Sequence, residues 1–414
     1  MQDIHLLSRI GFGCYRVSAK SPEHRAALKA ALSSGCNLID TSANYMGGQS
    51  EELVGLLLRE IPDGTAFVVT KAGYVSPPDH AFLRDHPHIL SNCAQLADGT
   101  LHCLDPDFLR FQLEQSLQRL GRNWIDGFLL HNPDYHLDMG VAAYQRIGRA
   151  FAMLEELARN GTIRFYGISS PSLGQPASPL TLDLGRLLEL SKHVASKNGF
   201  KLAQFPCNLA ELSPTADHDG RGSLLQRLKQ AELIGISNRP LNARSGGKRL
   251  RLAYRDDDGP MPDDQDIAES FTRIFALVDK QLAALDIDGS AEEITALSDL
   301  KVHWAAIDST DAVAEIFQSI IYPTLAQLYP DGIYPDVLSA IRILEILATR
   351  AARARMNEAA QTFHRKLIRD GILPENDGRP LPLVACEKLL NIGVDHVLVG
   401  MRSPAYVSAL SPLF

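Results

Sequence analysis

The stretch CNLIDTSANYMGGQSEELVG, residues 36–55, decides the fold of this chain. It opens with an apolar run that ends in Asp40, places a tyrosine at position 45, and continues into a helical pattern that begins near Ser50. An apolar strand followed at once by an amphipathic helix is the repeating unit of an α/β protein. The same unit recurs before and after this stretch, so the whole chain can be read from it.

Seven further apolar runs alternate with helical patterns. Parallel strands that are buried on both faces have continuous apolar runs rather than alternating ones. We predict the eight strands at residues 9–17, 36–42, 66–73, 124–132, 163–170, 200–207, 232–238 and 395–401. The predicted fold class is therefore α/β, a (β/α)8 TIM barrel.

The alternation is interrupted between the seventh and the eighth strand. The acidic stretch RDDDGPMPDDQD, residues 255–266, is followed by apolar residues at helical spacing, among them Ile267, Phe271 and Ile274. An interval this long exceeds an ordinary barrel connection. We therefore expect a large, mostly helical insertion at 256–380, with the barrel formed by 1–255 and 381–414.

Charge and composition exclude several classes of protein. With 41 basic and 49 acidic residues the formal net charge is -8, which argues against generic attraction to nucleic acid or to an anionic membrane. No cationic start with a long apolar stretch opens the chain, and no apolar run reaches the ~18 residues of a membrane span. Six cysteines without a CxxC pair do not indicate a disulfide framework. We expect a cytoplasmic protein.

Three successive predicted strands end in groups that can titrate. Asp40 closes the second strand, Lys71 the third and His131 the fourth, and Tyr45 follows Asp40. Each alone has an ordinary structural explanation, such as a turn cap, a rim charge or a satisfied buried histidine. In a barrel, however, the C-terminal ends of the strands meet at one mouth, and buried opposite charges there need each other.

The chemistry that suits these four groups is proton delivery to a carbonyl oxygen. A free phenol has a pKa of about 10, and a nearby ammonium stabilises the phenolate and lowers that pKa. Asp40 would keep Lys71 charged, while His131 could donate a hydrogen bond to the substrate oxygen. None of these groups supplies electrons, so a reduction implies a cofactor that donates hydride.

These motifs resemble the aldo/keto reductase family. The stretches LIDTSANY, VVTKAG and LEQSLQRLGRNWIDGFLLHNPD, followed by GTIRFYGISS, LAQFPCNL, NRPLNA and VLVGMRS, occur in family order over roughly residues 8–255 and 380–412. The resemblance implies an NADP(H)-dependent oxidoreductase that transfers hydride between nicotinamide and an aldehyde, ketone or sugar-like carbonyl, or the corresponding alcohol. It implies Tyr45 as general acid/base, Lys71 and Asp40 as groups that tune it, and His131 as the group that orients the substrate.

The resemblance also implies a set of cofactor contacts. The family binds the nicotinamide carboxamide through residues that match Ser169, Ser170 and Gln204, with Ser170 in place of an asparagine. Asn238 stands where the family has an aromatic ring that stacks on the nicotinamide. The remaining candidates at strand ends are Gly13, Cys14, Tyr15, Asp40, Arg239 and Leu241.

A basic segment after the seventh strand is a candidate for binding phosphate. NRPLNARSGGKRLRLAYR, residues 238–255, holds Arg239, Arg244, Lys248, Arg249, Arg251 and Arg255, and this region of a barrel commonly binds phosphate. Arg402, in GMRSPAYVSAL, is the candidate for the 2′-phosphate, so we expect NADPH as cofactor. A solvated charged face is the alternative explanation of the basic run.

Residues 80–103 are rich in histidine and cysteine, but their spacings fit no compact zinc template. We expect no metal there, and interpret the segment as a lengthened loop beside the substrate pocket. Two other functions stay open on sequence alone. One is a cofactor-binding regulatory barrel with weak redox activity, which contacts a protein partner or itself through the insertion. The other is a cofactor-free lyase or isomerase, which leaves Gln204 and the basic segment unexplained.

Overall fold

The computed structural model of this protein describes residues 4–245, 248–253, 261–375 and 377–414. The chain divides into two compact units, Met1–Ala243 together with Gly378–Phe414, and Arg244–Asp377. Each unit is described by itself.

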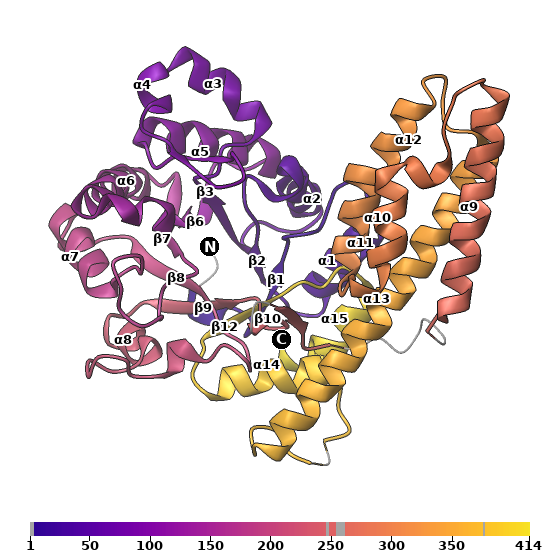
Figure 1. Ribbon diagram of the computed structural model, residues 1–414. Coiled ribbons are helices and arrows are strands. Elements are labelled where there is room, and N and C mark those ends of the chain that lie inside the picture. Colours follow the sequence, from indigo (N-terminus) through magenta and orange to yellow (C-terminus); the bar gives the residue numbers. More distant parts are fainter. Residues whose placement is uncertain (1–3, 246–247, 254–260, 376) are drawn as a thin grey trace. The chain divides into compact units, whose positions relative to one another are not determined.

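The first unit is a closed barrel of eight parallel strands in the order β1-β12-β9-β8-β7-β6-β3-β2 (Figure 1). The strands are β1 Ile10–Gly13, β2 Leu38–Asp40, β3 Phe67–Ala72, β6 Ile125–His131, β7 Ile163–Ser169, β8 Phe200–Pro206, β9 Ile234–Asn238 and β12 His396–Val399. Each falls inside one of the predicted apolar runs, and the predicted (β/α)8 fold is confirmed.

The barrel helices follow their strands, and several begin where the sequence supplies a cap. Ser21 accepts a hydrogen bond from the His24 N–H at the start of the helix that opens with Pro22. Asp105 accepts one from the Asp107 N–H at the start of the helix that opens with Pro106. The helices are α1 Pro22–Ser33, α2 Gln49–Leu58, α5 Pro106–Leu120, α6 Val141–Arg159, α7 Leu184–Val194, α8 Leu224–Gln230, α14 Leu381–Asn391 and α15 Pro404–Leu410. In Figure 1 they surround the strands.

Short elements fill the connections of this unit. They are η1 Ile4–Leu6, η2 Tyr45–Gly48, η3 Pro77–Asp79, α3 His80–Asp85, α4 Pro87–Leu90, β4 Ala94–Gln95, β5 Leu101–His102, η4 Pro133–Met139, η5 Ser213–Thr215 and η9 Ser411–Leu413. The segment predicted as a lengthened loop after the third strand therefore holds two short helices and the antiparallel hairpin β4–β5.

The interior of the barrel is apolar below its C-terminal mouth. The inward-facing side chains are Leu7, Leu38, Phe67, Val69, Leu129, Leu202, Ile236 and Leu398. Gly167 has no room for a larger residue, because an added Cβ would lie 1.9 Å from the Leu202 carbonyl oxygen. This packed floor leaves polar strand ends at the mouth as the place for chemistry.

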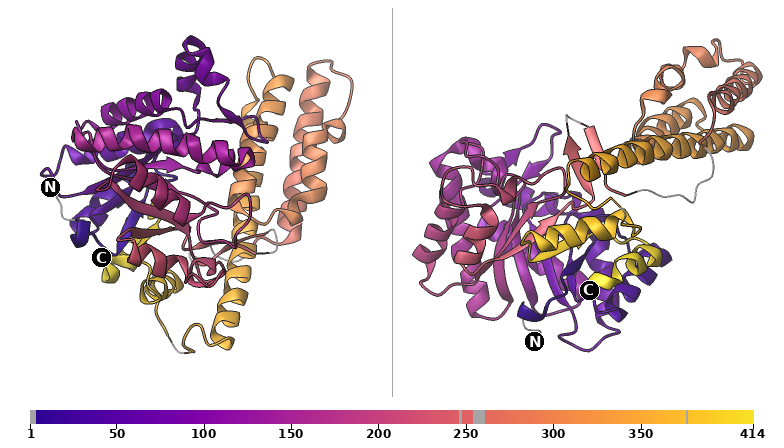
Figure 2. Two further views of the ribbon diagram at one scale, coloured as in Figure 1. Left: turned by 90° about the vertical axis from the view of Figure 1, so that its left-hand side faces the viewer. Right: turned by 90° about the horizontal axis from the view of Figure 1, so that it is seen from below.

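The second unit is mostly helical. Its helices are α9 Asp264–Ala284, η6 Ala291–Glu293, α10 Thr295–His303, η7 Trp304–Ala306, α11 Thr310–Ile316, the π-helical turn η8 Phe317–Ile321, α12 Tyr322–Leu328 and α13 Pro335–Arg369. Both views of Figure 2 show α13 as one long helix. Ahead of them, β10 Asn242–Ser245 and β11 Lys248–Arg251 form a two-stranded sheet within the segment that we predicted as a basic loop.

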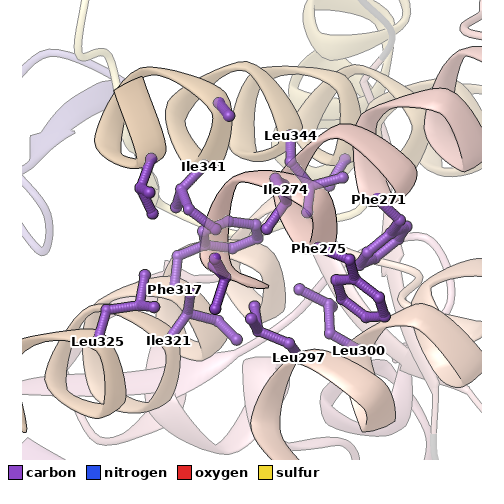
Figure 3. Close-up of a cluster of buried hydrophobic side chains, with 14 of the residues drawn as sticks. Phe271, Ile274, Phe275, Leu297, Leu300, Phe317, Ile321, Leu325, Ile341 and Leu344 are labelled. Atoms are coloured by element: carbon purple, nitrogen blue, oxygen red, sulfur yellow. The ribbon is translucent and has the colours of Figure 1, made fainter. Parts of the chain in front are cut away.

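This unit has its own apolar core (Figure 3). Phe271 and Ile274 of α9 pack with Phe317 of η8 and with Ile341 and Leu344 of α13. The domain boundaries predicted at 255/256 and 380/381 stay a prediction, and residues 254–260, around the first of them, lie outside the described part of the chain. No helix in the described residues is long and apolar enough to span a membrane.

Candidate active site

Asp40 and Lys71 meet because β2 and β3 are neighbours in the barrel. Asp40 pairs with Val69 in register, so Lys71, two residues further along β3, projects to the same face one step nearer the mouth. The Lys71 Nζ donates to Asp40 Oδ1 at 2.6 Å, and the Lys71 side chain is 0% exposed. A buried ammonium is thus paired with a buried carboxylate.

Tyr45 is brought to the same ammonium by a tight turn. Residues Met46, Gly47 and Gly48 all have positive φ (51°, 64° and 91°), and so they bend the chain just after Tyr45. The Tyr45 hydroxyl accepts a hydrogen bond from Lys71 Nζ at 3.2 Å. The third Lys71 proton goes to the Thr41 carbonyl oxygen at 2.7 Å, so all three ammonium donors are used.

The electrostatics of this triad keep the lysine charged and the phenol protonated. Burial lowers the pKa of Lys71, but Asp40 and Tyr45 raise it more, and the net pKa lies above the ordinary value. Burial raises the pKa of Tyr45, and Lys71 only partly offsets this, so the net pKa is also raised. The pKa expected from the sequence for Tyr45, lower than that of a free phenol, is wrong here because burial outweighs the ammonium.

His131 ends β6 and lies beside Tyr45, with ring centroids 5.9 Å apart. Burial, followed by the Lys71 charge, holds its pKa well below the ordinary value, so the imidazole is neutral. Its Nδ1 is 3.1 Å from Ser42 Oγ. The Ser42 hydroxyl has one proton, and Asn44 Oδ1 at 2.7 Å and the Lys71 carbonyl oxygen at 3.2 Å are also acceptors for it. If that proton goes to Nδ1 instead, the proton of the neutral ring is on Nε2, which is the donor that a substrate oxygen needs.

Gln204 at the end of β8 connects the far side of the mouth to Asp40. Its Nε2 donates to Asp40 Oδ2 at 2.7 Å, while its Oε1 accepts from Ser169 Oγ at 2.8 Å and from Asn238 Nδ2 at 3.2 Å. Asp40 is therefore held by Lys71 on one oxygen and by Gln204 on the other. Three of the predicted carboxamide and stacking positions thus join one hydrogen-bonded network.

The other predicted cofactor residues are distributed around this network. Gly13 ends β1, and the Cys14 N–H donates to the Asp40 carbonyl oxygen at 2.8 Å. Tyr15 is 61% exposed and meets the Tyr45 ring edge-on, with centroids 5.2 Å apart. Ser170 points elsewhere, since its hydroxyl donates to Asp134 Oδ1 at 2.7 Å.

The residues predicted to contact phosphate follow β9 and β12 in the chain. Arg239, at φ 54°, follows β9 and forms an ion pair with Glu211 at 3.5 Å. Leu241 is half-buried in the same connection, and Arg402 lies between β12 and α15. Arg255 and the side chains of Arg244, Lys248 and Arg249 lie outside the described part of the structure, whereas Arg251 ends β11.

The sequence prediction missed Ser42, Thr41 and the polar cluster of Tyr74, Asn132 and Tyr135. The Tyr74 hydroxyl lies 2.8 Å from that of Tyr135 and accepts from Asn132 Nδ2 at 2.6 Å. The signal for Ser42 was present, because a hydroxyl stands between Asp40 and Tyr45 in the motif itself. Its partner could be found only from the structure.

Comparison with known proteins finds similarity to one family over part of the chain. The model of the Aldo/keto reductase family matches residues 9–181. A D-threo-aldose 1-dehydrogenase from a Pseudomonas species is 30% identical over 176 residues, which are 39% of this chain and 49% of that protein. An NADH-specific methylglyoxal reductase from Escherichia coli K12 is 28% identical over 173 residues, 40% of this chain and 48% of that protein. The chain spans about half the length of the curated relatives it matches.

By structure, the chain is similar to the glycerol dehydrogenase AKR11B4 from Gluconobacter oxydans. The TM-score is 0.50 at 18% identity, and the match covers 99% of this chain and 86% of that one. Identity this low shows the fold alone. The family match adds sequence evidence: residues 9–181, the segment that carries Asp40, Tyr45, Lys71 and His131, are similar to the aldo/keto reductase family.

Proposed function

We propose that this protein is a nicotinamide-dependent oxidoreductase that interconverts a small carbonyl compound and its alcohol. The observation that carries the proposal is the buried triad in which Lys71 Nζ joins Asp40 at 2.6 Å and the Tyr45 hydroxyl at 3.2 Å, next to the neutral His131. The arrangement presents a protonated phenol at the mouth of the barrel. The names of the curated relatives, a dehydrogenase and a reductase, support the same class of reaction.

In the direction of reduction, Tyr45 is the general acid. Its raised pKa keeps the hydroxyl protonated at neutral pH, so it can donate a proton to the carbonyl oxygen. The cationic Lys71 then stabilises the phenolate that is left behind, and Asp40 holds the ammonium in place. The cofactor, when bound, supplies the hydride. In oxidation the phenolate takes the proton back.

His131 acts on the same oxygen as Tyr45, and Ser42 acts on His131. We propose that Ser42 donates its one proton to Nδ1 rather than to Asn44 Oδ1, so that the neutral imidazole offers its Nε2–H to the substrate carbonyl without carrying charge into the site. A neutral donor orients and polarises the oxygen, while the proton itself comes from Tyr45. His131 would thus orient the carbonyl oxygen, and Tyr45 would supply the proton.

We propose NADPH as the preferred cofactor, with Ser169, Gln204 and Asn238 near the nicotinamide and Arg402 at the 2′-phosphate. One relative is named NADH-specific, so this preference rests on Arg402 and on the basic segment of this chain. Fluorescence titration should give a lower dissociation constant for NADPH than for NADH, and Arg402→Ala should reduce the difference. Equal constants in the unmodified protein would contradict the preference.

A second candidate function is supported by Asn238. In place of a stacking ring it hydrogen-bonds Gln204, and the chain carries a second unit with its own core. A cofactor-binding regulatory barrel with weak redox activity, contacting a protein partner or itself through the helical unit, would combine these two features. It predicts cofactor binding without appreciable turnover.

One experiment separates these functions. The absorbance of the reduced nicotinamide is followed during incubation with a panel of aldehydes, ketones and aldoses, and in reverse with alcohols and NADP+. Turnover that is lost in Tyr45→Phe supports the oxidoreductase. Binding of NADPH with no turnover on any compound of the panel favours the regulatory barrel, and absence of binding refutes both.

A further inference from the structure

Three polar side chains form a continuous hydrogen-bonded chain that ends at the backbone carbonyl oxygen of His131. Arg146 of α6 lies with Nη1 3.0 Å from Nδ1 of His136 in η4. His136 Nε2 is 3.0 Å from Nδ1 of His102 in β5, and His102 Nε2 is 2.6 Å from the carbonyl oxygen of His131. Both histidines are 0% exposed, and the proton-transfer site described above uses neither of them.

The direction of these hydrogen bonds follows from their two ends. A carbonyl oxygen only accepts, so His102 Nε2 carries a proton and donates it to His131. In a neutral ring Nδ1 is then the acceptor, which makes His136 Nε2 the next donor. Arg146 has only donors, and it completes the series at His136 Nδ1. Every link thus points toward the same backbone oxygen.

Both rings are neutral over the pH range of most enzymes. Burial, with the neighbouring His136, lowers the pKa of His102 to about 3. Burial and the Arg146 charge lower the pKa of His136 to about 4. The bond to His131 is therefore unchanged at pH values well above 4, as a fixed support requires.

The backbone beside Lys71 is shaped to admit His102. The hairpin strand β5 pairs with the chain just after β3, through the Cys103 N–H to the Gly73 carbonyl at 2.8 Å and the Val75 N–H to the Leu101 carbonyl at 2.9 Å. Gly73 has a φ of 138°, and a Cβ added there would lie 2.6 Å from His102 Nε2. Only a glycine at position 73 leaves room for the His102 ring to reach the His131 carbonyl oxygen.

The point of contact is also where β6 ends. Asn132, the next residue, has a left-handed φ of 55°, so the chain turns away from the barrel just beyond the His131 carbonyl. The Asn132 N–H of the same peptide donates to the Ser169 carbonyl oxygen of β7 at 2.7 Å, so β7 holds one side of this peptide and His102 holds the other. The Tyr74 ring meets His131 edge-on at 4.9 Å and His102 edge-on at 5.3 Å, and it closes the same cluster.

We propose that His102 is a positioning residue for catalysis, which fixes the backbone of His131 and thereby aims the imidazole at the substrate oxygen. The inference rests on the proposed reaction. A buried histidine that merely satisfies its own polar atoms is the competing explanation, and it predicts a loss of stability without a specific loss of turnover. The hairpin after β3 would then contribute to catalysis without touching substrate.

Two substitutions of His102 separate these explanations. The amide nitrogen of Gln corresponds in reach to Nε2, so His102→Gln keeps a donor to the His131 carbonyl and loses the link to His136. The shorter Asn corresponds to Nδ1, so His102→Asn keeps contact with His136 and loses the bond to His131. His88→Asn makes the same change at an exposed histidine of the same segment and is the control.

We expect His102→Asn to lower kcat about 10- to 100-fold, the range that displacement of a catalytic group costs, with little change in the dissociation constant of NADPH. His102→Gln should keep most of the turnover, and His88→Asn all of it. Equal kcat in the Asn and Gln variants, or a kcat loss that follows only their melting temperatures, would overturn the proposal.

A measurement without turnover keeps this inference apart from the proposed reaction. In 15N NMR of the full chain, the imidazoles of His102 and His136 should both be protonated on Nε2 and should not titrate between pH 5 and 9. If either ring were protonated on Nδ1, the proposed hydrogen-bonded chain from Arg146 to the His131 carbonyl oxygen would be refuted, even in an active enzyme. If the tautomers are as expected but the protein reduces no carbonyl compound, the hydrogen-bonded chain stands. The proposed reaction is then refuted, and so is the catalytic role of His102.

Discussion

At the scale of single residues, the sequence predicted which groups meet but not how burial changes them. Asp40, Lys71 and His131 could be placed because strand ends in a barrel converge. The pKa direction of Tyr45 could not, since it depends on how far burial outweighs one ammonium. Ser42 was missed for a similar reason, because its role depends on a partner 89 positions along the chain.

Tyr45→Phe tests the proton donor directly. The change removes one hydroxyl and keeps the ring that packs between Tyr15 and His131. We expect turnover to fall by about 10² to 10⁴, the usual contribution of general acid catalysis, while the affinity for NADPH hardly changes. Lys71→Met acts through the same proton, so the double variant should be little worse than the worse single one. Near-normal turnover in Tyr45→Phe would show that the proton comes from elsewhere.

Ser42→Ala tests the tautomer of His131. If Ser42 donates to Nδ1 as proposed, removing the hydroxyl takes away the donor that holds the ring proton on Nε2, and the loss of one hydrogen bond should lower kcat by about two- to tenfold. Ser42→Thr keeps a hydroxyl at this position and should restore turnover. An alanine variant with unchanged kcat would mean that the tautomer is set by something other than Ser42.

At the scale of elements, the eight strands could be predicted because parallel strands buried on both faces are apolar throughout. The hairpin β4–β5 could not, since each of its strands has only two residues and no pattern can be read from so few. The histidines of that segment looked like metal ligands or loop residues. In the structure His102 is buried at 0% exposure, and only the pairing of β5 with the end of β3 explains why.

This buried histidine cluster predicts how stability depends on pH. His102, His136 and His131 all have folded-state pKa values below the ordinary 6.5, so the unfolded chain binds more protons. The stability that these neutral histidines contribute is therefore fully present above about pH 6.5. It is lost as the pH falls toward the folded-state pKa values of about 4 for His136 and about 3 for His102. Urea unfolding at a series of pH values should show this slope, and His102→Gln should make it shallower. A slope unchanged in the variant would mean that His102 keeps its ordinary pKa in the folded protein.

At the scale of the whole molecule, the sequence indicated a barrel interrupted by helices, but not what the helices do. Periodic apolar residues predict that α9 and α13 bury a face, and the core around Phe271, Phe317 and Ile341 fits that pattern. A function for these helices needs a partner or a substrate, and neither is encoded in periodicity. Only the barrel carries the motifs that made its chemistry predictable.

The last prediction concerns this helical unit. Its apolar core is internal, so replacing residues 261–377 by a short Gly/Ser linker should leave a folded barrel that still binds NADPH, as circular dichroism and fluorescence titration would show. If the unit acts as a lid or a contact surface, KM for the substrate or the oligomeric state should change. Phe317→Ala is a core substitution that should lower the free energy of unfolding of this unit by about 3 to 5 kcal/mol. In the full chain it should change KM or the oligomeric state in the same direction as the deletion does. Unchanged KM and unchanged oligomeric state in both variants would exclude both roles, and the activity would then belong to the barrel alone.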